Sequence, residues 1–543
     1  NIRRVLAHFA HRCDAQRCGR QIREHRRSLL AFDSPVVVCR PAYESIKRLP
    51  ETVDSMGPGR DQSGGGAEQI PPLLAASLLM AVAMATTTTA TTSIDICSLA
   101  RGADGFVDVM ANASSSSSSS NGMMLATATD CVISGDVRIF LPAYRAAFSE
   151  ATAQPPLYVT SIILSGVSIL GDVVLLGGDG VLVAGSVEMV VENSNVTATL
   201  AAFDVRVNVV DASFIFQRTN LSSHARALCF FATTLENVDV TTLLGWYYHI
   251  NITIVRCDIG IDQGNVHEQA TMGVMSVMYD IEPTTAAGGR NIPLLNQSAL
   301  LVSDTKIHLG TRDVYRYWPM LLSPVGPIED TSWQLVGLRI DAPRTSRIAV
   351  LSMRGVSRSV VRVINVAVSV NIVIQFVIVD CPNGMTRSNL SVIGLAVQST
   401  NVGSFEQSGS TVLVLGGGVS ESTIVMDDCD VNVKGGALFF AQVVGGDTAT
   451  RQLCHDVTIM IRNNHVIHYL SYRCFGHVVV VAGMAASSSS SRVIVTNNTF
   501  VVSQSFVRAM LFHDLDGVSI DVSDNRLSYC GEFNCVFCTG GTY

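Results

Sequence analysis

The sequence lacks the uninterrupted apolar stretch of about 20 residues that a membrane-spanning helix requires. The best candidate, VVRVINVAVSVNIVIQFVIV at 360–379, is broken by Arg362, Asn365, Asn371 and Gln375. Even so, 48% of the 543 residues are hydrophobic, only 15% are charged, and the mean hydropathy is +0.34. Valine and isoleucine favour strands that are buried on one face. The composition therefore indicates sheet rather than membrane helix.

Basic residues are scarce outside the amino-terminal segment. Residues 1–55 hold 11 Lys and Arg against 6 Asp and Glu, whereas the remainder holds 26 against 39. Such an acidic body offers no basic stripe to neutralise phosphate groups. We therefore expect no nucleic-acid partner.

The sequence also lacks a nucleophile elbow, a P-loop and a dinucleotide-binding fingerprint. His465 and His468 lie three apart, which places them on opposite faces of a strand, so they would not share a metal ion. Cys13, Cys18 and His25 do not show the tight paired spacing and fourth ligand of a zinc site. We predict no metal and no cofactor.

The chain does contain one repeated pattern: apolar-x-apolar, then two or three small or polar residues, then apolar-x-apolar again. The period of two within each arm indicates strands with one buried face. The eight copies are VEMVVENSNVTA from 187, VRVNVVDASFIF from 205, NITIVRCDIGI from 251, ALLVSDTKIHL from 299, STIVMDDCDVNV from 422, VTIMIRNNHVIH from 457, RVIVTNNTFVVS from 492 and VSIDVSDNRLSYC from 518.

Each copy has a predicted corner residue between its two arms. The spacing of the corners is irregular, and we expect the gap of 124 residues between Thr305 and Cys429 to hide divergent copies such as VRVINVAVSVNI at 361–372. A constant corner with variable spacing indicates a solenoid whose loops leave from one side, rather than a propeller. The predicted corners are Ser194, Ala212, Cys257, Thr305, Cys429, Asn464, Asn498 and Asn525.

Asparagine and aspartate suit such corners because they tolerate the left-handed backbone region, and stacked amides form ladders. The alternative is a β-sandwich with asparagine at hairpin tips. Two-residue hairpin turns prefer Asn-Gly, however, and none of the eight corners contains glycine. We therefore predict an all-β parallel β-helix. At Asn497-Asn498-Thr499 a glycan on Asn497 would mean that Asn497 projects outward and that Asn498 alone makes the turn.

We divide the chain into four parts. Residues 1–55 form an atypical basic segment, disordered or non-native. Residues 56–85 form a signal-peptide region, because PPLLAASLLMAVAMA ends in a small-x-small pattern; a buried core helix is the alternative. Residues 86–130 form a Thr/Ser-rich linker, and residues 131–543 form the β-helix.

Asparagine sequons and cysteines agree with secretion, although neither is specific. Eleven cysteines remain after Cys13, Cys18 and Cys39 are set aside, so at least one thiol would be unpaired or intermolecular. The candidate disulfide residues at the end of the chain are Cys530, Cys535 and Cys538. The predicted glycosylation sites are Asn112, Asn195, Asn220, Asn251, Asn296, Asn389 and Asn497.

Two kinds of site were considered. Tyr315, Tyr317 and Trp318 offer an aromatic cluster for binding a sugar or a protein, although a loop that folds back to cap the flank of the solenoid is the favoured interpretation. Carboxylates near a corner or strand end suggest polysaccharide cleavage, but turn chemistry alone accounts for most of them. The weak catalytic candidates are Asp514 and Asp516 with His513, and the other carboxylates are Asp380, Asp427 and Asp428.

Valine-rich arms with corners such as IVMDDCDV and VIVTNNTFVV, serine runs and a secreted amino terminus resemble the dispersed gene family type of kinetoplastid surface proteins and their membrane-associated relatives. The resemblance implies a pectate-lyase-like, right-handed parallel β-helix, surface-exposed and glycosylated, with no catalytic residues to carry over. We expect a secreted or cell-surface protein that binds matrix, glycan or a host surface without catalysis. Because no membrane span precedes the final CTGGTY, membrane attachment is not expected from this chain. The alternative is a polysaccharide lyase or glycoside hydrolase on the same scaffold.

Overall fold

The computed structural model describes residues 90–528 and 536–539, apart from the internal segments 103–104, 111–121, 142–158, 178–182, 233–246, 263–272, 280–292, 311–319, 325, 343–346, 371–374, 400–408, 435–436, 446–451, 470–475, 487–489 and 504–506. The predicted segments 1–55 and 56–85 lie outside the described residues.

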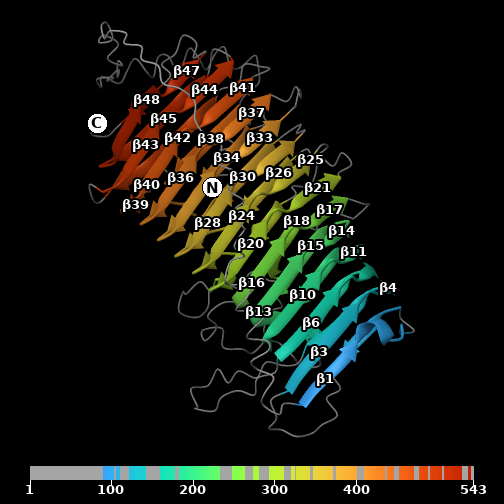
Figure 1. Cartoon of the computed structure of the whole chain (residues 1–543). Coiled ribbons are helices and arrows are strands. Elements are labelled where there is room, and N and C mark those ends of the chain that lie inside the picture. Colours follow the sequence, from blue (N-terminus) through green and yellow to red (C-terminus); the bar gives the residue numbers. More distant parts are fainter. Residues whose placement is uncertain are drawn as a thin grey trace, which may run out of the picture.

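The described strands form three long sheets, A, B and C, whose strands stack in parallel along one axis (Figure 1). Sheet A contains β1 (Ala90–Asp95), β3 (Gly122–Thr129), β6 (Val159–Ser165), β9 (Val183–Gly185), β10 (Val187–Glu192), β13 (Asn208–Gln217), β16 (Tyr247–Val255), β19 (Leu295–Asn296), β20 (Ala299–Ser303), β23 (Ile328–Glu329), β24 (Ser332–Val336), β27 (Val356–Ser357), β28 (Val360–Ile364), β31 (Met385–Thr386), β32 (Asn389–Ile393), β35 (Val419–Ser420), β36 (Thr423–Asp427), β40 (Thr458–Arg462), β43 (Arg492–Thr496) and β46 (Ser519–Ser523).

Sheet C contains β4 (Val132–Ser134), β7 (Ser168–Leu170), β11 (Asn195–Thr197), β14 (Asn220–Ser223), β17 (Asp258–Asp262), β21 (Lys306–Gly310), β25 (Arg339–Ala342), β29 (Ala367–Val370), β33 (Ala396–Ser399), β37 (Asp430–Lys434), β41 (His465–Tyr469), β44 (Thr499–Ser503) and β47 (Arg526–Ser528).

Sheet B contains β2 (Val107–Met110), β5 (Val137–Leu141), β8 (Val173–Gly177), β12 (Ala201–Arg206), β15 (Arg226–Ala232), β18 (Gly273–Tyr279), β22 (Met320–Pro324), β26 (Arg347–Ser352), β30 (Gln375–Cys381), β34 (Gly409–Leu415), β38 (Ala437–Val444), β39 (Gln452–Cys454), β42 (Gly476–Ala486), β45 (Val507–Asp516) and β48 (Val536–Thr539). A short 3-10 helix, η2 (Ile96–Ser98), follows β1.

Each rung of the solenoid visits the sheets in the order A, C, B. β40 leads to β41 and then to β42, and the next strand, β43, pairs in parallel with β40, with Thr458 opposite Arg492. Alternate side chains point inward and fill one continuous apolar core, which includes Trp333 and Phe500. A fully buried side chain of this size contributes about 1.5–3 kcal/mol. The predicted all-β parallel β-helix is confirmed, and the parallel pairings exclude the sandwich alternative.

The turn between sheets A and C consists of two residues with different tasks. Asn463 and Asn497 adopt the left-handed region, with φ of 57° and 53°, and are exposed. The next residues, Asn464 and Asn498, are buried, with 2% and 1% of their surface exposed. The predicted corner was therefore one position late. Asn497, not Asn498, adopts the left-handed backbone conformation, because the outward residue makes the turn from sheet A to sheet C.

The inward residues of these corners stack as predicted for a ladder. Asn464 donates from its backbone N–H and Nδ2 to Oδ1 of Asn498 at 3.0 and 2.9 Å, and Asn498 does the same to Oδ1 of Asn525 at 3.0 and 2.8 Å. Nδ2 of Asn498 also donates to the carbonyl oxygen of Ile461 at 2.8 Å. The buried amides thereby satisfy one another and the backbone.

Ala212 does not belong to this column of corners. It follows Asp211, which has φ of 55°, at a second corner within sheet A, between the part of β13 that pairs with β9 and the part that pairs with β10. The A-to-C corner of the same rung is at Thr219, whose hydroxyl donates to backbone carbonyls as the hydroxyls of Ser194 and Thr305 do. The long sequence gap holds three further rungs, whose inward corner residues are the apolar Leu338, Val366 and Leu395.

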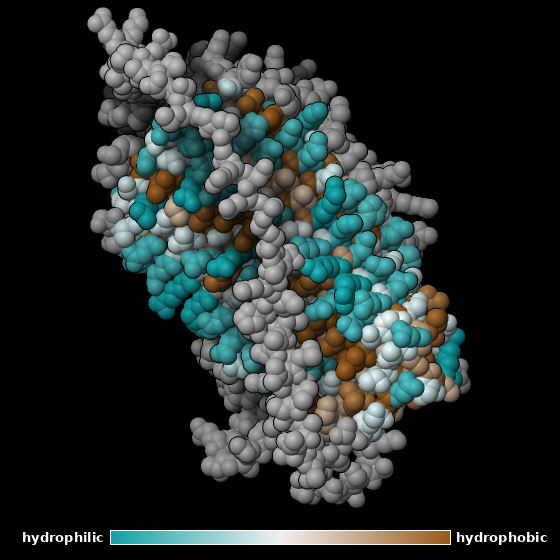
Figure 2. Space-filling model, viewed as in Figure 1, coloured by the Kyte–Doolittle hydropathy of each residue, from teal (hydrophilic) through white to brown (hydrophobic). Residues whose placement is uncertain are grey.

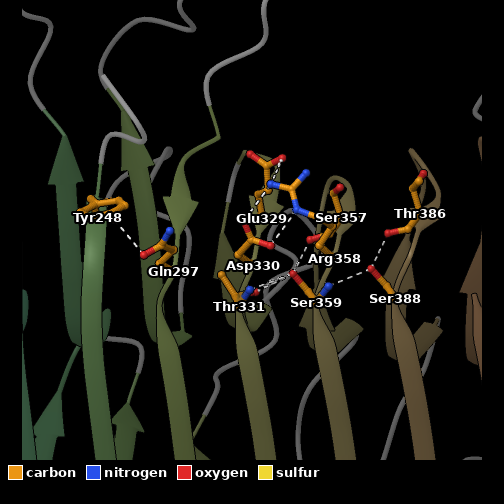
Figure 3. A network of polar contacts seen from close by, with 10 residues as sticks. All are labelled: Tyr248, Gln297, Glu329, Asp330, Thr331, Ser357, Arg358, Ser359, Thr386 and Ser388. Atoms are coloured by element: carbon orange, nitrogen blue, oxygen red, sulfur yellow. Dashed lines mark hydrogen bonds and ion pairs between the residues drawn. The ribbon is translucent and has the colours of Figure 1, made fainter. Parts of the chain in front are cut away.

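The second corner carries a ladder of hydroxyl groups that the sequence pattern did not reveal (Figure 3). The hydroxyl of Ser359 accepts the N–H of Thr331 at 3.0 Å, and the hydroxyl of Ser388 accepts the N–H of Ser359 at 3.0 Å. Outside this ladder, the left-handed Arg358 pairs with Glu329 at 2.7 Å and with Asp330 at 2.8 Å. Arg358 lowers the pKa of Asp330 through their hydrogen bond.

The stack begins before residue 131, within the segment predicted as a linker. β1, β2 and β3 lie in 86–130 and pair with later strands of the same sheets. Their inward positions include Val109 and the small residues Ala126 and Ala128, which are fully buried. Small side chains and threonine-rich outer faces made these strands resemble a linker in composition.

Candidate functional site

A groove of about 370 Å³ lies at the corner between sheets C and B in the first rungs of the described stack. The connections from β4 to β5 and from β7 to β8 are only two residues long, Gly-Asp in both cases. Its volume falls in the range of small-molecule sites. The lining residues are Arg101, Gly105, Phe106, Gly135, Asp136, Leu170, Gly171, Thr197 and Thr199.

Glycine makes the floor of the groove. A Cβ atom on Gly171 would lie 2.4 Å from the carbonyl carbon of Gly135, and one on Gly135 would lie 2.9 Å from both Nη2 of Arg101 and the carbonyl oxygen of Gly105. Gly135 also has a positive φ of 123°. Since successive rungs place these glycines one above the other, the backbones of the two corners are in close contact, and a side chain on either glycine would clash.

Arg101 reaches the groove from a short segment between η2 and β2. Its Nε donates to the carbonyl oxygen of Gly105 at 2.6 Å. A disulfide joins Cys97, in η2, to Cys131, which precedes β4, with the Cα atoms 6.2 Å apart. The disulfide and the buried Ile96 hold this segment against the stack.

Two aspartates follow the floor glycines, and each binds the corner above it. Oδ1 of Asp136 accepts the N–H of Asp172 at 2.8 Å, while Oδ1 of Asp172 accepts the N–H groups of Thr199 and Leu200 at 2.7 and 3.2 Å. Burial raises the pKa of Asp172, the backbone hydrogen bonds oppose this shift, and the nearby Asp136 adds to it. Asp136 is the carboxylate that lines the groove.

Apolar surface borders the polar part of the groove. The guanidinium of Arg138 stacks over the ring of Phe106, 4.0 Å from its centroid, and pairs with Asp108 at 2.6 and 2.8 Å, which fixes the ring. Leu170 is 50% exposed and Leu200 is 46% exposed. In Figure 2, hydrophobic (brown) and neutral (white) residues gather at the end of the stack that carries β1 and β4, whereas hydrophilic (teal) residues dominate its middle.

The predicted carboxylate candidates lie elsewhere and are engaged by neighbouring rungs. Asp427 pairs with Arg462 at 2.8 Å and accepts a hydrogen bond from Asn463. Asp428 is itself a left-handed corner, with φ of 53°, as turn chemistry requires. Asp380 is half-buried on β30.

The weak catalytic candidates all lie on β45, far along the stack from the groove. His513 and Asp516 are exposed, whereas the side chain of Asp514 lies outside the described residues. Their role as a catalytic group stays a prediction. His465 is exposed and His468 is buried, so their predicted placement on opposite faces is confirmed.

Other predicted groups are not described. Tyr315, Tyr317 and Trp318 lie outside the described residues, as do Cys530 and Cys535, and for Cys538 only the backbone is placed. Within the described part of the chain, no cluster of three His, Cys, Asp or Glu side chains could hold a metal ion. The buried thiols of Cys381 and Cys429 have pKa values that burial raises to about 12, so both thiols are unreactive.

Five of the predicted sequons are exposed and one is not. Asn296 is only 6% exposed, so a glycan does not fit there in the folded chain. Asn112 lies outside the described residues. The exposed sequon asparagines are Asn195, Asn220, Asn251, Asn389 and Asn497.

Sequence reasoning missed the groove, although a signal was present. The segments SGDV at 134–137 and LGDV at 170–173 repeat the same Gly-Asp-Val pattern at the same corner. The repeated pattern is defined by small or polar residues between apolar arms, and glycine beside them is typical of hairpin turns. A glycine at a different corner of each rung therefore went unnoticed.

Comparisons with known proteins give little further information. No family model matches the chain, and no curated protein matches it. Among solved structures, a crystal structure of a GH136 lacto-N-biosidase from Eubacterium ramulus is similar, with 9% sequence identity over 83% of this chain and 70% of that chain, and a TM-score of 0.22. This similarity is too weak to carry an argument about function.

Proposed function

We propose that the protein is a secreted or cell-surface β-helix that binds a glycan in the groove formed by Arg101, Asp136, Thr197 and Thr199. The observation that carries the proposal is the combination of these polar groups with Phe106 and Leu170 in one cavity. Sugars present hydroxyl groups beside apolar C–H faces, so they need donors, acceptors and an apolar surface together.

The polar groups have complementary tasks. The guanidinium of Arg101 donates hydrogen bonds, the carboxylate of Asp136 accepts them, and the hydroxyls of Thr197 and Thr199 do both. The glycine floor lets a sugar ring approach the backbone closely. Because the groove is bordered by short corners of consecutive rungs, its walls are rigid before the ligand arrives.

The disulfide supports the proposed location. Disulfides persist in oxidising compartments such as the cell exterior and are rare in the cytosol. Cys97 and Cys131 form such a bond at the edge of the stack. In the described part of the chain, no helix has both the length and the hydrophobicity to cross a bilayer. The resemblance to kinetoplastid surface proteins stays a prediction.

A glycan array incubated with the full chain, made in a secretory host, tests this function. We expect binding to at least one glycan, and a loss of affinity of about tenfold or more for Arg101→Ala, since a hydrogen bond to a charged group contributes about 1.5–3 kcal/mol. Arg339→Ala, an exposed arginine on β25 distant from the groove, is the matched control. Binding that survives Arg101→Ala and Asp136→Asn unchanged would refute the groove as the site.

Glycoside hydrolysis is the second candidate, and the Asp136–Asp172 pair favours it. Glycosidases need two carboxyl groups, one of them held protonated as a general acid. Burial raises the pKa of Asp172, the neighbour of Asp136, as a general acid requires, whereas its carboxylate accepts the N–H groups of Thr199 and Leu200 and only Asp136 lines the groove. Release of reducing sugar from an array-selected glycan, abolished by Asp136→Asn while binding is retained, would establish hydrolysis; binding without release would leave a binding protein.

A further inference from the structure

We propose that an N-linked glycan on Asn195 of the same chain occupies and regulates the groove, an inference that rests on the proposed glycan-binding function. The sequon Asn195-Val196-Thr197 spans β11. Its third residue, Thr197, lines the groove. Modification and binding therefore use the same strand.

The geometry of β11 places both residues on its outer face. Asn195 and Thr197 are exposed, whereas Val196 between them is fully buried. Side chains two apart on a strand point the same way and are about 7 Å apart. Thr197 lies opposite Leu170 on β7, which is half-exposed and also lines the groove. The first sugars of a glycan on Asn195 would extend over these two residues.

Attachment to the chain gives such a glycan a strong advantage over free ligands. A group on a short tether has an effective concentration of the order of millimolar. If the tethered glycan itself occupies the groove with a Kd of about 0.1 mM, an effective concentration of about 1 mM makes any free glycan bind about tenfold more weakly. In the glycosylated chain, ligands of low affinity would therefore fail to displace the tethered glycan, whereas ligands of high affinity would still bind.

The other exposed sequons do not have this relation to the groove. Asn220 is the register partner of Asn195, one strand further from the groove, on β14. Asn251 and Asn389 lie on sheet A, and Asn497 lies at a distant A-to-C corner. Asn220→Gln is therefore a close control, and Asn251→Gln is a distant one.

The test uses the full chain secreted from glycosylating eukaryotic cells, with each sequon's occupancy measured by mass spectrometry. N,N′-diacetylchitobiose, the core disaccharide of N-linked glycans, serves as the binding probe. We expect Asn195 to carry a glycan and Asn195→Gln to bind the probe about tenfold more tightly than the glycosylated wild type. Asn220→Gln and Asn251→Gln should leave the affinity unchanged.

Arginine labelling with phenylglyoxal provides a readout that needs no free ligand. Arg101 should react several-fold more slowly in the glycosylated wild type than in Asn195→Gln, with Arg339 as the internal reference. The inference would be overturned if Asn195 carries no glycan. It would also be overturned if Asn195 carries a glycan but Arg101 is labelled at the same rate in the wild type and in Asn195→Gln. If Arg101 is protected but no form binds the disaccharide or an array glycan, the covering glycan is supported while the proposed binding of free glycans fails.

Discussion

The first rungs and the last rungs of the stack share one architecture but differ in what fills their corners. At the first rungs, Gly135 and Gly171 pack backbone against backbone at the C-to-B corner and line a groove. At the last rungs, Asn464, Asn498 and Asn525 fill the A-to-C corner with a hydrogen-bonded column. Corner residues of the same solenoid therefore either line a groove or close the stack with hydrogen bonds, and the proposed binding belongs to the first kind of corner.

The largest effect should come from the disulfide, which secures only the first rungs. Cys97 and Cys131 are 34 residues apart, and closing a loop of this length contributes about 3–4 kcal/mol in the chain-entropy description. The double variant Cys97→Ser with Cys131→Ser should show faster hydrogen exchange in β2–β5 while β40–β46 keep their protection. Equal loss of protection at both ends would mean that the stack responds as one unit.

The amide column should be the next most sensitive feature. Asn498→Ala removes the acceptor for the backbone N–H and Nδ2 of Asn464 and leaves both buried, at a cost of about 2–3 kcal/mol. The measurement is thermal unfolding. The variant Asn498→Thr should regain part of the lost stability, because a threonine hydroxyl can accept the backbone N–H of the preceding rung, as Thr305 accepts the N–H of Cys257 in the same column. An Asn498→Ala variant as stable as the wild type would show that the column is dispensable.

Filling the glycine floor should weaken the groove end alone. Gly171→Ala forces its new Cβ against the backbone of Gly135 and Asp136, at a cost of about 1–3 kcal/mol, and must displace these two groove-lining residues. Gly260→Ala on β17 is the matched control, because its Cβ would lie 3.9 Å from the nearest atom, Oγ of Ser222. We expect glycan affinity and melting temperature to fall for the first variant only. Equal behaviour of the two would remove the argument for a glycine floor.

The smallest effect concerns the charge of Asp172. Because its pKa is raised in the folded state above the ordinary value of 3.8, the folded chain holds this proton more tightly than the unfolded chain. The ionisation of Asp172 therefore lowers the free energy of unfolding as the pH rises from below 3.8, its ordinary pKa, to above its raised pKa in the folded chain. The melting temperature of Asp172→Asn minus that of the wild type should increase from about pH 3 to about pH 7. A difference that does not depend on pH would show that Asp172 is not perturbed.

The sequence predicted the fold well where polar corners interrupt apolar arms. Asn464, Asn498 and Asn525 were predicted as corners because Asn-Asn or Asp-Asn inside a strand pattern has few explanations other than a turn. Of the three rungs with an apolar residue at the same place, the one with Val366 was expected as a divergent copy, whereas those with Leu338 and Leu395 were not predicted, since an apolar corner looks like continuous strand. The start of the stack was missed for a related reason: β1–β3 bury small residues and resemble a linker in composition.

The candidate site was far less predictable than the fold. Arg101 and Asp136 are 35 positions apart, and only stacking of rungs brings them to one cavity. The sequence around Asp427 and Asp428 suggested catalytic carboxylates. In the structure Asp427 pairs with Arg462, and Asp428 is the left-handed corner residue. A single sequence shows which residues turn the chain, whereas the corner that borders a groove depends on the register between rungs.

A crystal structure of the full chain with the glycan selected on the array tests the central claim most directly. The account predicts sugar hydroxyls within hydrogen-bonding distance of the Arg101 guanidinium and the Asp136 carboxylate, with a ring face against Leu170 or Phe106. A glycan bound instead on the outer face of the rungs that carry Asn464 and Asn498, with the groove empty, would contradict it.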